Sequence, residues 1–290
     1  MPKISVIIPL YNKADYIVKT VNSVLEQSFQ DFELLIIDDG STDNSLALVK
    51  TISDTRIHIH QQENKGVSAA RNKGVKLAKS QFVAFLDADD YWKEKHLENL
   101  IYLKQKHPKE VIFTAAYTVN YYKKTIDYTL KNHKNPLNFF SNSRSFSLIN
   151  SSNCIFNKAV FDTIGFFKTT LQGGEDTDFW IRVGLAYKLC FTNEITVIIT
   201  KNNTNQASNN LDNYSNCSYL FDYNEEEKND FQFKKYMDLQ RYGLLMRFRK
   251  KGEKHEKEQA ILKDLNTSNL RLKQQFALRL PKKLLKLLSL

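Results

Sequence analysis

The chain has 290 residues, carries 42 Lys and Arg against 32 Asp and Glu, and is 42% hydrophobic. This composition excludes an intrinsically disordered chain, and the length is sufficient for a full hydrophobic core. Three cysteines without CxxC spacing argue against a disulfide framework and a zinc site. The sequence opens directly into a predicted strand, and no apolar run reaches the roughly 18 residues of a membrane span, so we expect a cytoplasmic protein without a signal peptide.

The N-terminal part alternates predicted strands with predicted helices. Strands are predicted at residues 4–10, from 32 to the acidic pair at 38–39, at 56–60 and at 82–86, and helices at 14–27 and 66–80. This alternation is typical of βαβ units. It predicts an α/β fold with a mostly parallel central sheet flanked by helices.

The predicted strand at 82–86 ends in the sequence FLDADD. In extended backbone, Asp87 and Asp89 point the same way, and two carboxylates suit a hard cation such as Mn²⁺ or Mg²⁺. In open α/β sheets, ligands bind beyond the carboxyl ends of the strands. The alternative is an acidic turn that caps the following helix.

Two other predicted strands end in polar side chains. Asp38 and Asp39 end the strand that begins at Phe32, and Tyr11 follows Pro9 at the end of the first strand. Several such ends on one edge of one sheet predict a binding site. The alternative for Asp38 is a buried turn carboxylate that accepts hydrogen bonds from backbone N–H groups.

A later motif, GGEDTDFWIRV, covers residues 173–183 and is predicted to be helical from Asp176 onward. Glu175 and Asp176 could simply stabilise the positive N-terminus of this helix. Trp180 fits the buried face of the helix, and Asp178 could face a ligand or be solvated.

In order, the segments SVIIPLYN, DFELLIIDDGSTD, NKGVSAARNKGVKLAKSQFVAFLDADD and IGFFKTTLQGGEDTDFWIRV resemble the inverting glycosyltransferases of family 2, over residues 3–200. The resemblance implies the GT-A (nucleotide-diphospho-sugar transferase) fold. It also implies metal-dependent transfer of a sugar from a nucleotide-diphospho-sugar, most readily a UDP-sugar, to a hydroxyl of a glycan or lipid-linked glycan with inversion. The cofactor would be Mn²⁺ or Mg²⁺.

The resemblance also implies roles for residues on the donor side. Asp39 would accept a hydrogen bond from a uracil imide, and Asp89 would bind the metal together with Asp87. Arg71 would lie near the phosphates of the donor. The alternative for Arg71 is a surface ion pair. The residues matched to nucleotide-sugar binding are Pro9, Tyr11, Asp38, Asp39, Arg71, Asp87 and Ala88.

On the acceptor side, Asp176 matches the general base that takes the proton of the attacking hydroxyl. Glu175, Trp180 and Ser152 are expected on the acceptor side. The chain departs from many relatives in having GFF where they have GGF, and its Asn-rich stretch after the helix contains no His and only Lys201 as a cation. A third protein ligand for the metal therefore stays unassigned.

Two other functions were considered. A catalytically inactive nucleotide-sugar-binding relative is expected to lack one of Asp39, Asp89 and Asp176, and all three are present. A nucleotidyltransferase is expected to have a glycine-rich loop early in the chain, and the first turn here, PLYNKAD, has no glycine.

We expect a catalytic domain at residues 1–215, with a nucleotide-sugar-binding half at 1–110 and an acceptor half at 111–215. Within the second half, a strand is predicted at 111–119 and a polar loop at 120–147. Residues 216–290 are expected to form a basic, amphipathic helical appendage.

All of the net charge lies near the C-terminus. Residues 241–290 contain 14 Lys and Arg against 4 Asp and Glu, and the first 240 residues contain 28 of each sign. The Leu-rich tail at 270–290 reads as a basic amphipathic helix interrupted at Pro281, which favours peripheral binding to the inner, anionic membrane surface. The alternatives are packing on the catalytic domain, a homodimer contact, or a solvated face. The tail lacks interleaved aromatic residues, so nucleic acid is not expected as a partner.

Overall fold

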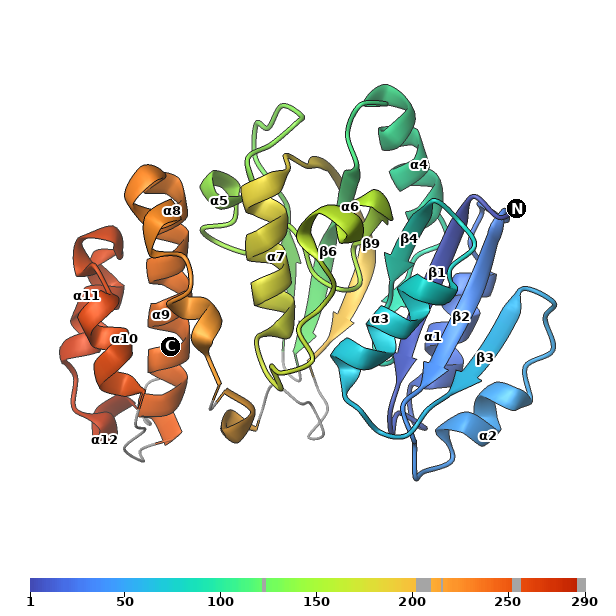
Figure 1. Ribbon diagram of the computed structural model, residues 1–290, viewed down its shortest axis with the longest axis horizontal. Coiled ribbons are helices and arrows are strands. Elements are labelled where there is room, and N and C mark those ends of the chain that lie inside the picture. Colours follow the sequence, from blue (N-terminus) through green and yellow to red (C-terminus); the bar gives the residue numbers. More distant parts are fainter. Residues whose placement is uncertain (122–123, 202–209, 215, 252–256, 286–290) are drawn as a thin grey trace. The chain divides into compact units, whose positions relative to one another are not determined.

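The computed structural model describes residues 1–121, 124–201, 210–214, 216–251 and 257–285, and Figure 1 traces the chain. By their contacts these residues form two compact units. The first contains residues 1–139, 146–170 and 175–201. The second contains 140–145, 171–174 and the described residues from 210 onward.

The first unit is built on a sheet in which the described residues form nine strands. They are β1 (Ile4–Leu10), β2 (Phe32–Asp38), β3 (Ile57–Gln61), β4 (Phe82–Phe85), β5 (Tyr91–Trp92), β6 (Ile112–Tyr121), β7 (Lys124–Tyr128), β8 (Cys154–Asn157) and β9 (Cys190–Thr200). Their order is β3-β2-β1-β4-β8-β6-β9-β5, with β7 paired to β6. β3, β2, β1 and β4 are parallel to one another, and β6 is parallel to β9. β8 runs antiparallel to β4 and β6, β7 runs antiparallel to β6, and β5 runs antiparallel to β9. The prediction of a mostly parallel sheet is confirmed.

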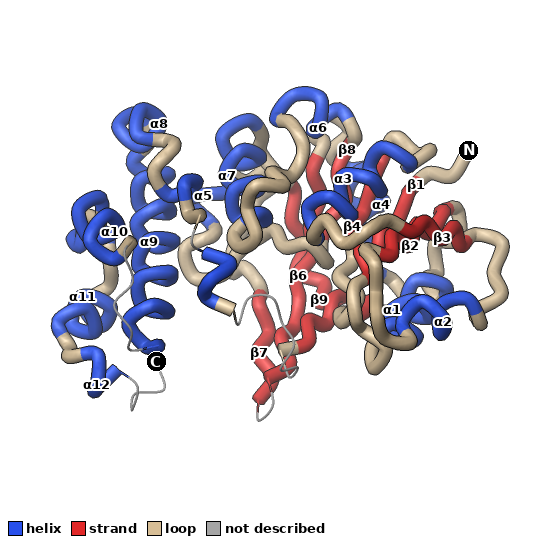
Figure 2. The backbone as a smooth tube through the Cα atoms, turned by 60° about the horizontal axis from the view of Figure 1, so that its bottom comes forward, coloured by secondary structure: helices blue, strands red, loops and turns tan. Residues whose placement is uncertain are grey.

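Helices lie on both sides of this sheet (Figure 2). The helices of the first unit are α1 (Ile17–Leu25), α2 (Ser45–Lys50), α3 (Val67–Leu77), α4 (His96–Lys106), α6 (Ala159–Ile164) and α7 (Glu175–Ala186). Helix α5 (Phe139–Asn142) lies almost entirely in the second unit. Alternate side chains of β1 face opposite sides, as a strand requires. Val6 and Ile8 belong to the cluster that includes Val21 of α1 and Leu97 of α4, whereas Ile7 meets α3.

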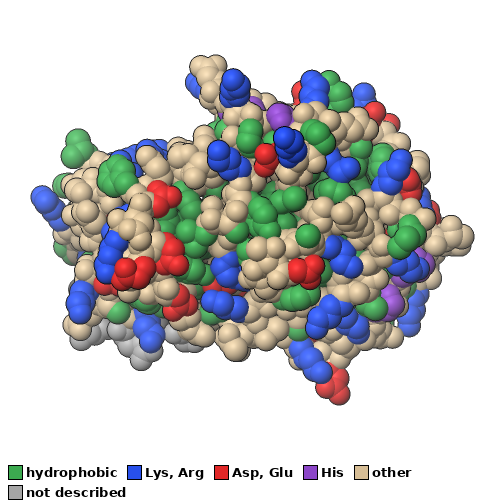
Figure 3. All heavy atoms as spheres, turned by 45° about the horizontal axis from the view of Figure 1, so that its top comes forward, with side chains coloured by type: hydrophobic (Ala, Val, Ile, Leu, Met, Phe, Trp, Pro, Cys, Tyr) green, Lys and Arg blue, Asp and Glu red, His purple; other side chains and the backbone are tan. Residues whose placement is uncertain are grey.

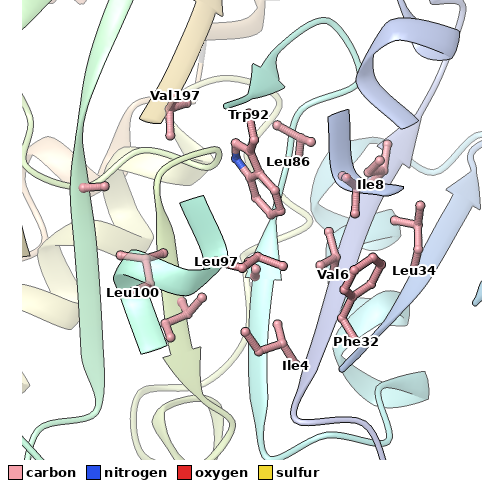
Figure 4. Close-up of a cluster of buried hydrophobic side chains, with 14 of the residues drawn as sticks. Ile4, Val6, Ile8, Phe32, Leu34, Leu86, Trp92, Leu97, Leu100 and Val197 are labelled. Carbon is pink, nitrogen blue, oxygen red and sulfur yellow. The ribbon is translucent and has the colours of Figure 1, made fainter. Parts of the chain in front are cut away.

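The cluster on the α1 and α4 side is fully apolar at its centre (Figure 4). Val6, Leu34, Leu97 and Leu100 are 0% exposed. Trp92 lies in the same cluster, yet its indole N–H donates a hydrogen bond to the carbonyl of Ser152 at 2.6 Å. A core side chain therefore binds Ser152, which contacts the acidic turn that follows β4.

One expectation for local structure and one alternative were wrong. Residues 120–147 do not form one polar loop, because β6 extends to Tyr121 and pairs with β7, where Tyr117 stacks on Tyr128 at 5.0 Å between ring centroids. The acidic turn after β4 does not cap a helix either. It leads into β5, and α4 begins only at His96.

The second unit is helical in its described residues. Its helices are α8 (Asn224–Asn229), α9 (Phe231–Lys251), α10 (Glu258–Asp264), α11 (Leu272–Arg279) and α12 (Lys282–Leu285), with 3-10 turns at Leu211–Tyr214, Ser218–Leu220 and Thr267–Asn269. The tail is helical as expected, and Pro281 separates α11 from α12. The Asn-rich stretch that follows Lys201 falls mainly on 202–209, outside the described residues.

A buried ion-pair network lies in the second unit. Arg241 is 0% exposed and donates to both oxygens of Glu227 and to the carbonyl of Leu220. Asp238, also 0% exposed, accepts from Lys234 and from the backbone N–H of Asn266. Within the described residues, no helix has the length and the apolar composition that a membrane span requires.

Helix α3 packs so closely on β1 that it needs a glycine. A methyl group at Gly74 would lie 2.4 Å from Cγ2 of the buried Ile7. We expect Gly74→Ala to lower the free energy of unfolding by about 1–3 kcal/mol through overpacking, measured by urea denaturation.

The matched control is Gly243→Ala in the middle of α9, where an added methyl group would meet nothing within 4 Å. There the better helix propensity of alanine should raise stability by roughly 0.5–1 kcal/mol. Equal effects of the two substitutions would contradict the close packing of α3 on β1.

Candidate active site

The carboxyl ends of three parallel strands meet at one edge of the sheet. Leu10 at the end of β1 is paired with Asp38 at the end of β2, and the N–H of Leu86, just after β4, donates to the carbonyl of Ile7. The turns that follow β1, β2 and β4 therefore lie together, as the sequence predicted. They bring Tyr11, Asp39 and Asp87 to the same edge.

The acidic turn after β4 is held from behind by Asp90. Its Oδ2 accepts from the Ser152 hydroxyl at 2.6 Å, and its Oδ1 accepts from the N–H of Thr200 at 2.9 Å. The Ser152 hydroxyl in turn accepts from the N–H of Asp87 at 3.2 Å. The pKa of Asp90 lies well above its ordinary value. Burial is the largest cause, and the negative charges of Asp87 and Asp89 act in the same direction.

Arg71 of α3 joins this turn to helix α7. Its NH2 group donates to Oδ1 of Asp87 at 2.8 Å, and its NH1 group donates to Oε1 of Glu175 at 3.2 Å. The side chain is only 4% exposed, so the alternative of a surface ion pair is wrong. Burial disfavours the charge of Arg71, but Asp87 and Glu175 outweigh it, and the pKa of Arg71 lies above its usual value.

Lys13 is a cation of the site that the sequence reading missed. Its Nζ lies 2.6 Å from Oδ2 of Asp89, and both side chains are largely buried. Lys13 is two residues beyond Tyr11, in the turn after β1. The rule that strand ends gather at one edge would have found it, had basic residues been considered together with acidic ones.

The first turn of α7 presents two different carboxyl groups. Asp176 is partly buried, and its Oδ1 accepts from the N–H of Thr177 at 2.6 Å and from the Thr177 hydroxyl at 3.2 Å. Among the described residues, none donates a hydrogen bond to its Oδ2. Glu175 instead faces Arg71. Burial first, and then the Asp176 carboxylate, raises the pKa of Glu175 to about 7, while Arg71 acts in the opposite direction.

Asp39 organises the loop that leads into α3. Its Oδ1 accepts from the Gln62 side chain at 2.7 Å and from the N–H of Lys65 at 2.9 Å, and its Oδ2 accepts from the N–H of Gly66 at 2.8 Å. Asp38 is 1% exposed, and its Oδ1 accepts from the N–H of Ser41 at 3.3 Å. Asp38 thus has the contacts of a buried turn carboxylate, which is the alternative that the sequence analysis left open for this residue.

The remaining donor-side candidates differ in exposure. Tyr11 is 44% exposed, whereas Pro9 is buried within β1 and Ala88 is only 4% exposed. The carbonyl of Ala88 accepts a hydrogen bond from Thr20 at 3.0 Å. Of these three, Tyr11 is the side chain that can offer a ring face to a ligand.

Three expectations on the acceptor side need correction. Trp180 is 3% exposed and stacks on Phe156, so it belongs to the core and offers no acceptor surface. Ser152 is 1% exposed and is used inside the protein by Asp87 and Asp90. Asp178 neither faces a ligand nor is solvated, because it is 0% exposed and paired with Lys168 and Arg182.

The donor set of the acidic turn fits a divalent cation bound together with a phosphate ligand. Mg²⁺ and Mn²⁺ prefer oxygen ligands, and with nucleotides Mg²⁺ typically uses one or two carboxylates plus phosphate oxygens. Asp87 and Asp89 supply two such carboxylates. In the part of the chain that the structure describes, no group of three acidic, His or Cys side chains is arranged as a complete protein cage.

The raised pKa of Glu175 predicts a pH-dependent stability. Its pKa rises from 4.5 to about 7 in the folded protein, so the folded state binds more protons than the unfolded chain within that window. Stability should therefore fall as the pH rises from 4.5 to about 7. Glu175→Gln should remove up to about 3 kcal/mol of this decline, measured by urea denaturation at both ends of the window.

Glu94→Gln, at an exposed glutamate of the same unit, is the control and should keep the decline of the wild type. An unchanged decline in Glu175→Gln would show that another group causes it.

Comparison with known proteins shows to which family the chain belongs. Residues 5–165, more than half of the chain, match the model described as Glycosyl transferase family 2. A segment of 117 residues is 42% identical to the putative teichuronic acid biosynthesis glycosyltransferase TuaG of Bacillus subtilis, covering 39% of this chain and 46% of that protein. A segment of 123 residues is 39% identical to the UDP-Glc:alpha-D-GlcNAc-diphosphoundecaprenol beta-1,3-glucosyltransferase WfaP of Escherichia coli, covering 42% of this chain and 47% of that protein.

The chain thus spans less than half the length of these two relatives. Among solved structures, TarS 1-349 of S. aureus in complex with UDP-GlcNAc superimposes with a TM-score of 0.72 at 19% identity, over 92% of this chain and 82% of that chain. At that identity the likeness establishes the fold, which is GT-A-like with additional C-terminal helices. The protein belongs to glycosyl transferase family 2.

Proposed function

We propose that this protein transfers a sugar from a UDP-sugar to a hydroxyl of a glycan or lipid-linked glycan, with inversion and with Asp176 as the general base. The observation that carries the proposal is the position of Arg71. One guanidinium contacts both Asp87, in the acidic turn, and Glu175, next to Asp176. A donor held at the acidic turn would therefore lie close to the carboxylate that activates the acceptor.

The donor proposal rests on the strand-end turns and on the relatives. Tyr11 offers an exposed ring at the end of β1, and Asp39 lies beside it at the end of β2. TarS is described in complex with UDP-GlcNAc, and the name of WfaP gives UDP-Glc as its donor. Both favour a uridine nucleotide. Arg71 is already engaged by two carboxylates, so we assign it to positioning them rather than to direct contact with phosphate.

Among the described residues, carboxyl groups outnumber cations at this edge, and this supports a metal requirement. The cations are Lys13 and Arg71, and the carboxyl groups are those of Asp87, Asp89, Glu175 and Asp176. The excess negative charge would repel an anionic diphosphate unless a divalent cation lay between them. We propose that Asp89 and Asp87 hold Mn²⁺ or Mg²⁺, with the donor phosphates completing its ligands. When bound, the cation would stabilise the charge of the departing nucleoside diphosphate.

Asp176 has the contacts expected of a general base. Its Oδ1 is fixed by Thr177, so the carboxylate is oriented, and its Oδ2 can accept the proton of an acceptor hydroxyl. Glu175 is the competing candidate, because a pKa near neutrality suits a base. However, its Oε1 is bound to Arg71, so we assign Glu175 to holding Arg71.

The setting is proposed from the relatives alone. TuaG is named for teichuronic acid biosynthesis and WfaP for transfer to a diphosphoundecaprenol-linked sugar. A role in the assembly of a bacterial cell-surface polysaccharide, at the cytoplasmic face of the membrane, agrees with both names.

Donor and metal binding are tested by calorimetric titration of UDP and GDP with and without Mn²⁺. We expect UDP to bind more tightly with Mn²⁺, and Asp89→Ala to lose about tenfold or more in affinity for UDP with Mn²⁺. Asp162→Ala, at an exposed aspartate of α6, should bind as the wild type does. Failure of both nucleotides to bind under any condition would refute the donor site and favour an inactive relative.

The general base is tested by turnover of a UDP-sugar with Asp176→Asn. We expect kcat to fall by about 10²–10⁴-fold while UDP affinity is kept. Asp162→Asn is the matched control, because Asp162 also lies in the first turn of a helix and would reveal a mere effect on helix stability. A larger loss of kcat in Glu175→Gln than in Asp176→Asn would move the role of base to Glu175.

A further inference from the structure

Helix α11 exposes two large apolar side chains that nothing in its own unit covers. Leu272 is 84% exposed and Phe276 is 64% exposed, which places them among the most exposed large hydrophobic residues described. They are four residues apart, so they lie next to each other on one face of the helix.

The opposite face of α11 is fixed within the second unit. Ala277 is 1% exposed and packs with Met246 of α9 and Leu285 of α12. Arg249 of α9 donates to the carbonyls of Leu278 at 2.5 Å and of Leu280 at 3.0 Å. The helix therefore cannot rotate to bury Leu272 and Phe276 without breaking these contacts.

Basic side chains border the apolar pair. Arg279 lies seven residues after Leu272, on the same face of the helix, and Lys273 is the residue next to Leu272. The side chains of Arg279 and Lys273 are both exposed. The sequence contains no Asp or Glu after Asp264. Figure 3, which draws one face of the whole molecule, shows acidic and basic side chains intermingled over that face.

A second copy of the chain fits this surface poorly. A stable protein interface buries roughly 800 Å² on each partner, whereas α11 offers two large apolar side chains over eight residues. In a two-fold contact the same patch would meet itself, so Lys273 and Arg279 would face like charges. An anionic lipid surface fits both features, because its phosphates can contact the basic rim and its acyl chains can cover the apolar pair.

We propose that α11 binds the interface of an anionic lipid bilayer. Leu272 and Phe276 would enter the boundary between headgroups and acyl chains, and Lys273 and Arg279 would contact lipid phosphates. The proposal stands on the geometry and charge of α11 and does not depend on the proposed transferase activity. Were both correct, the helix would keep the enzyme on the surface that holds a lipid-linked acceptor.

The test is co-sedimentation of the full chain with vesicles. One set contains phosphatidylcholine alone, and the other contains equal parts of phosphatidylcholine and phosphatidylglycerol. We expect binding to the second set only, weakened by high salt because exposed charges are screened. The double variant Leu272→Ser/Phe276→Ser should lose about tenfold or more in partitioning, and Lys273→Gln/Arg279→Gln should bind more weakly than the wild type.

Phe231→Ser is the matched control, because Phe231 is 61% exposed but lies at the start of α9. It should partition as the wild type does. All variants change exposed residues, and circular dichroism would confirm that they fold. UDP titration of the same preparations reports the donor site separately, so failure of one proposal is distinguishable from failure of the other.

Two results would overturn the proposal. One is absence of binding to the anionic vesicles at low salt, or binding that the Leu272→Ser/Phe276→Ser variant leaves unchanged. The other is a concentration-dependent dimer, seen by analytical ultracentrifugation, that this variant abolishes. That second result would assign the surface to self-association.

Discussion

The buried guanidinium of Arg71 is the interaction on which the arrangement of the site depends. A guanidinium taken out of water is unfavourable unless opposite charges compensate it, and Arg71, which is 4% exposed, has two such partners in Asp87 and Glu175. The two carboxylates are 88 residues apart in sequence, so local structure cannot bring them together. Arg71 links the end of a central strand to the first turn of α7. The position of Arg71 depends in turn on Asp39, which fixes the loop preceding α3 through three hydrogen bonds.

The acidic turn is rigid because its support lies in the core. Asp90 and Ser152 bind each other behind Asp87, and the indole of Trp92 holds the carbonyl of Ser152. Thr20 of α1 binds the carbonyls of Ala88 and Asp90 from the other side. Three like charges in four residues would otherwise repel one another. The hydrogen bonds from Ser152 and Thr200 and the ion pair with Lys13 oppose that repulsion, so the turn can present Asp87 and Asp89 in one arrangement.

Much of the fold and the edge of the site could be predicted because both follow from periodicity. Two short apolar runs end at Asp38 and at Asp87, and their alternation with helices predicts parallel strands. Parallel strands bring their carboxyl ends to one edge of the sheet whatever the details of packing. Side-chain partners do not follow from periodicity. The pairing of Arg71 with Glu175 and the ion pairs of the buried Asp178 depend on how α3 and α7 approach the sheet. The strand β7 was missed because the polar composition of 120–147 hid the pairing of Tyr117 with Tyr128. Of the interruptions between helices in the C-terminal tail, only the one at Pro281 was predictable, because the proline ring removes a backbone hydrogen-bond donor.

Gly74 and Arg71 lie three residues apart on α3 and so share a face of the helix. At Gly74 the helix backbone comes so close to Ile7 that no methyl group fits between them. This contact distance also sets how far the Arg71 side chain can extend toward Asp87 and Glu175. A glycine with no chemistry of its own thus works as the spacer of the candidate active site. A side chain at position 74 would therefore disturb the packing of α3 on β1 and the placement of the Arg71 guanidinium together.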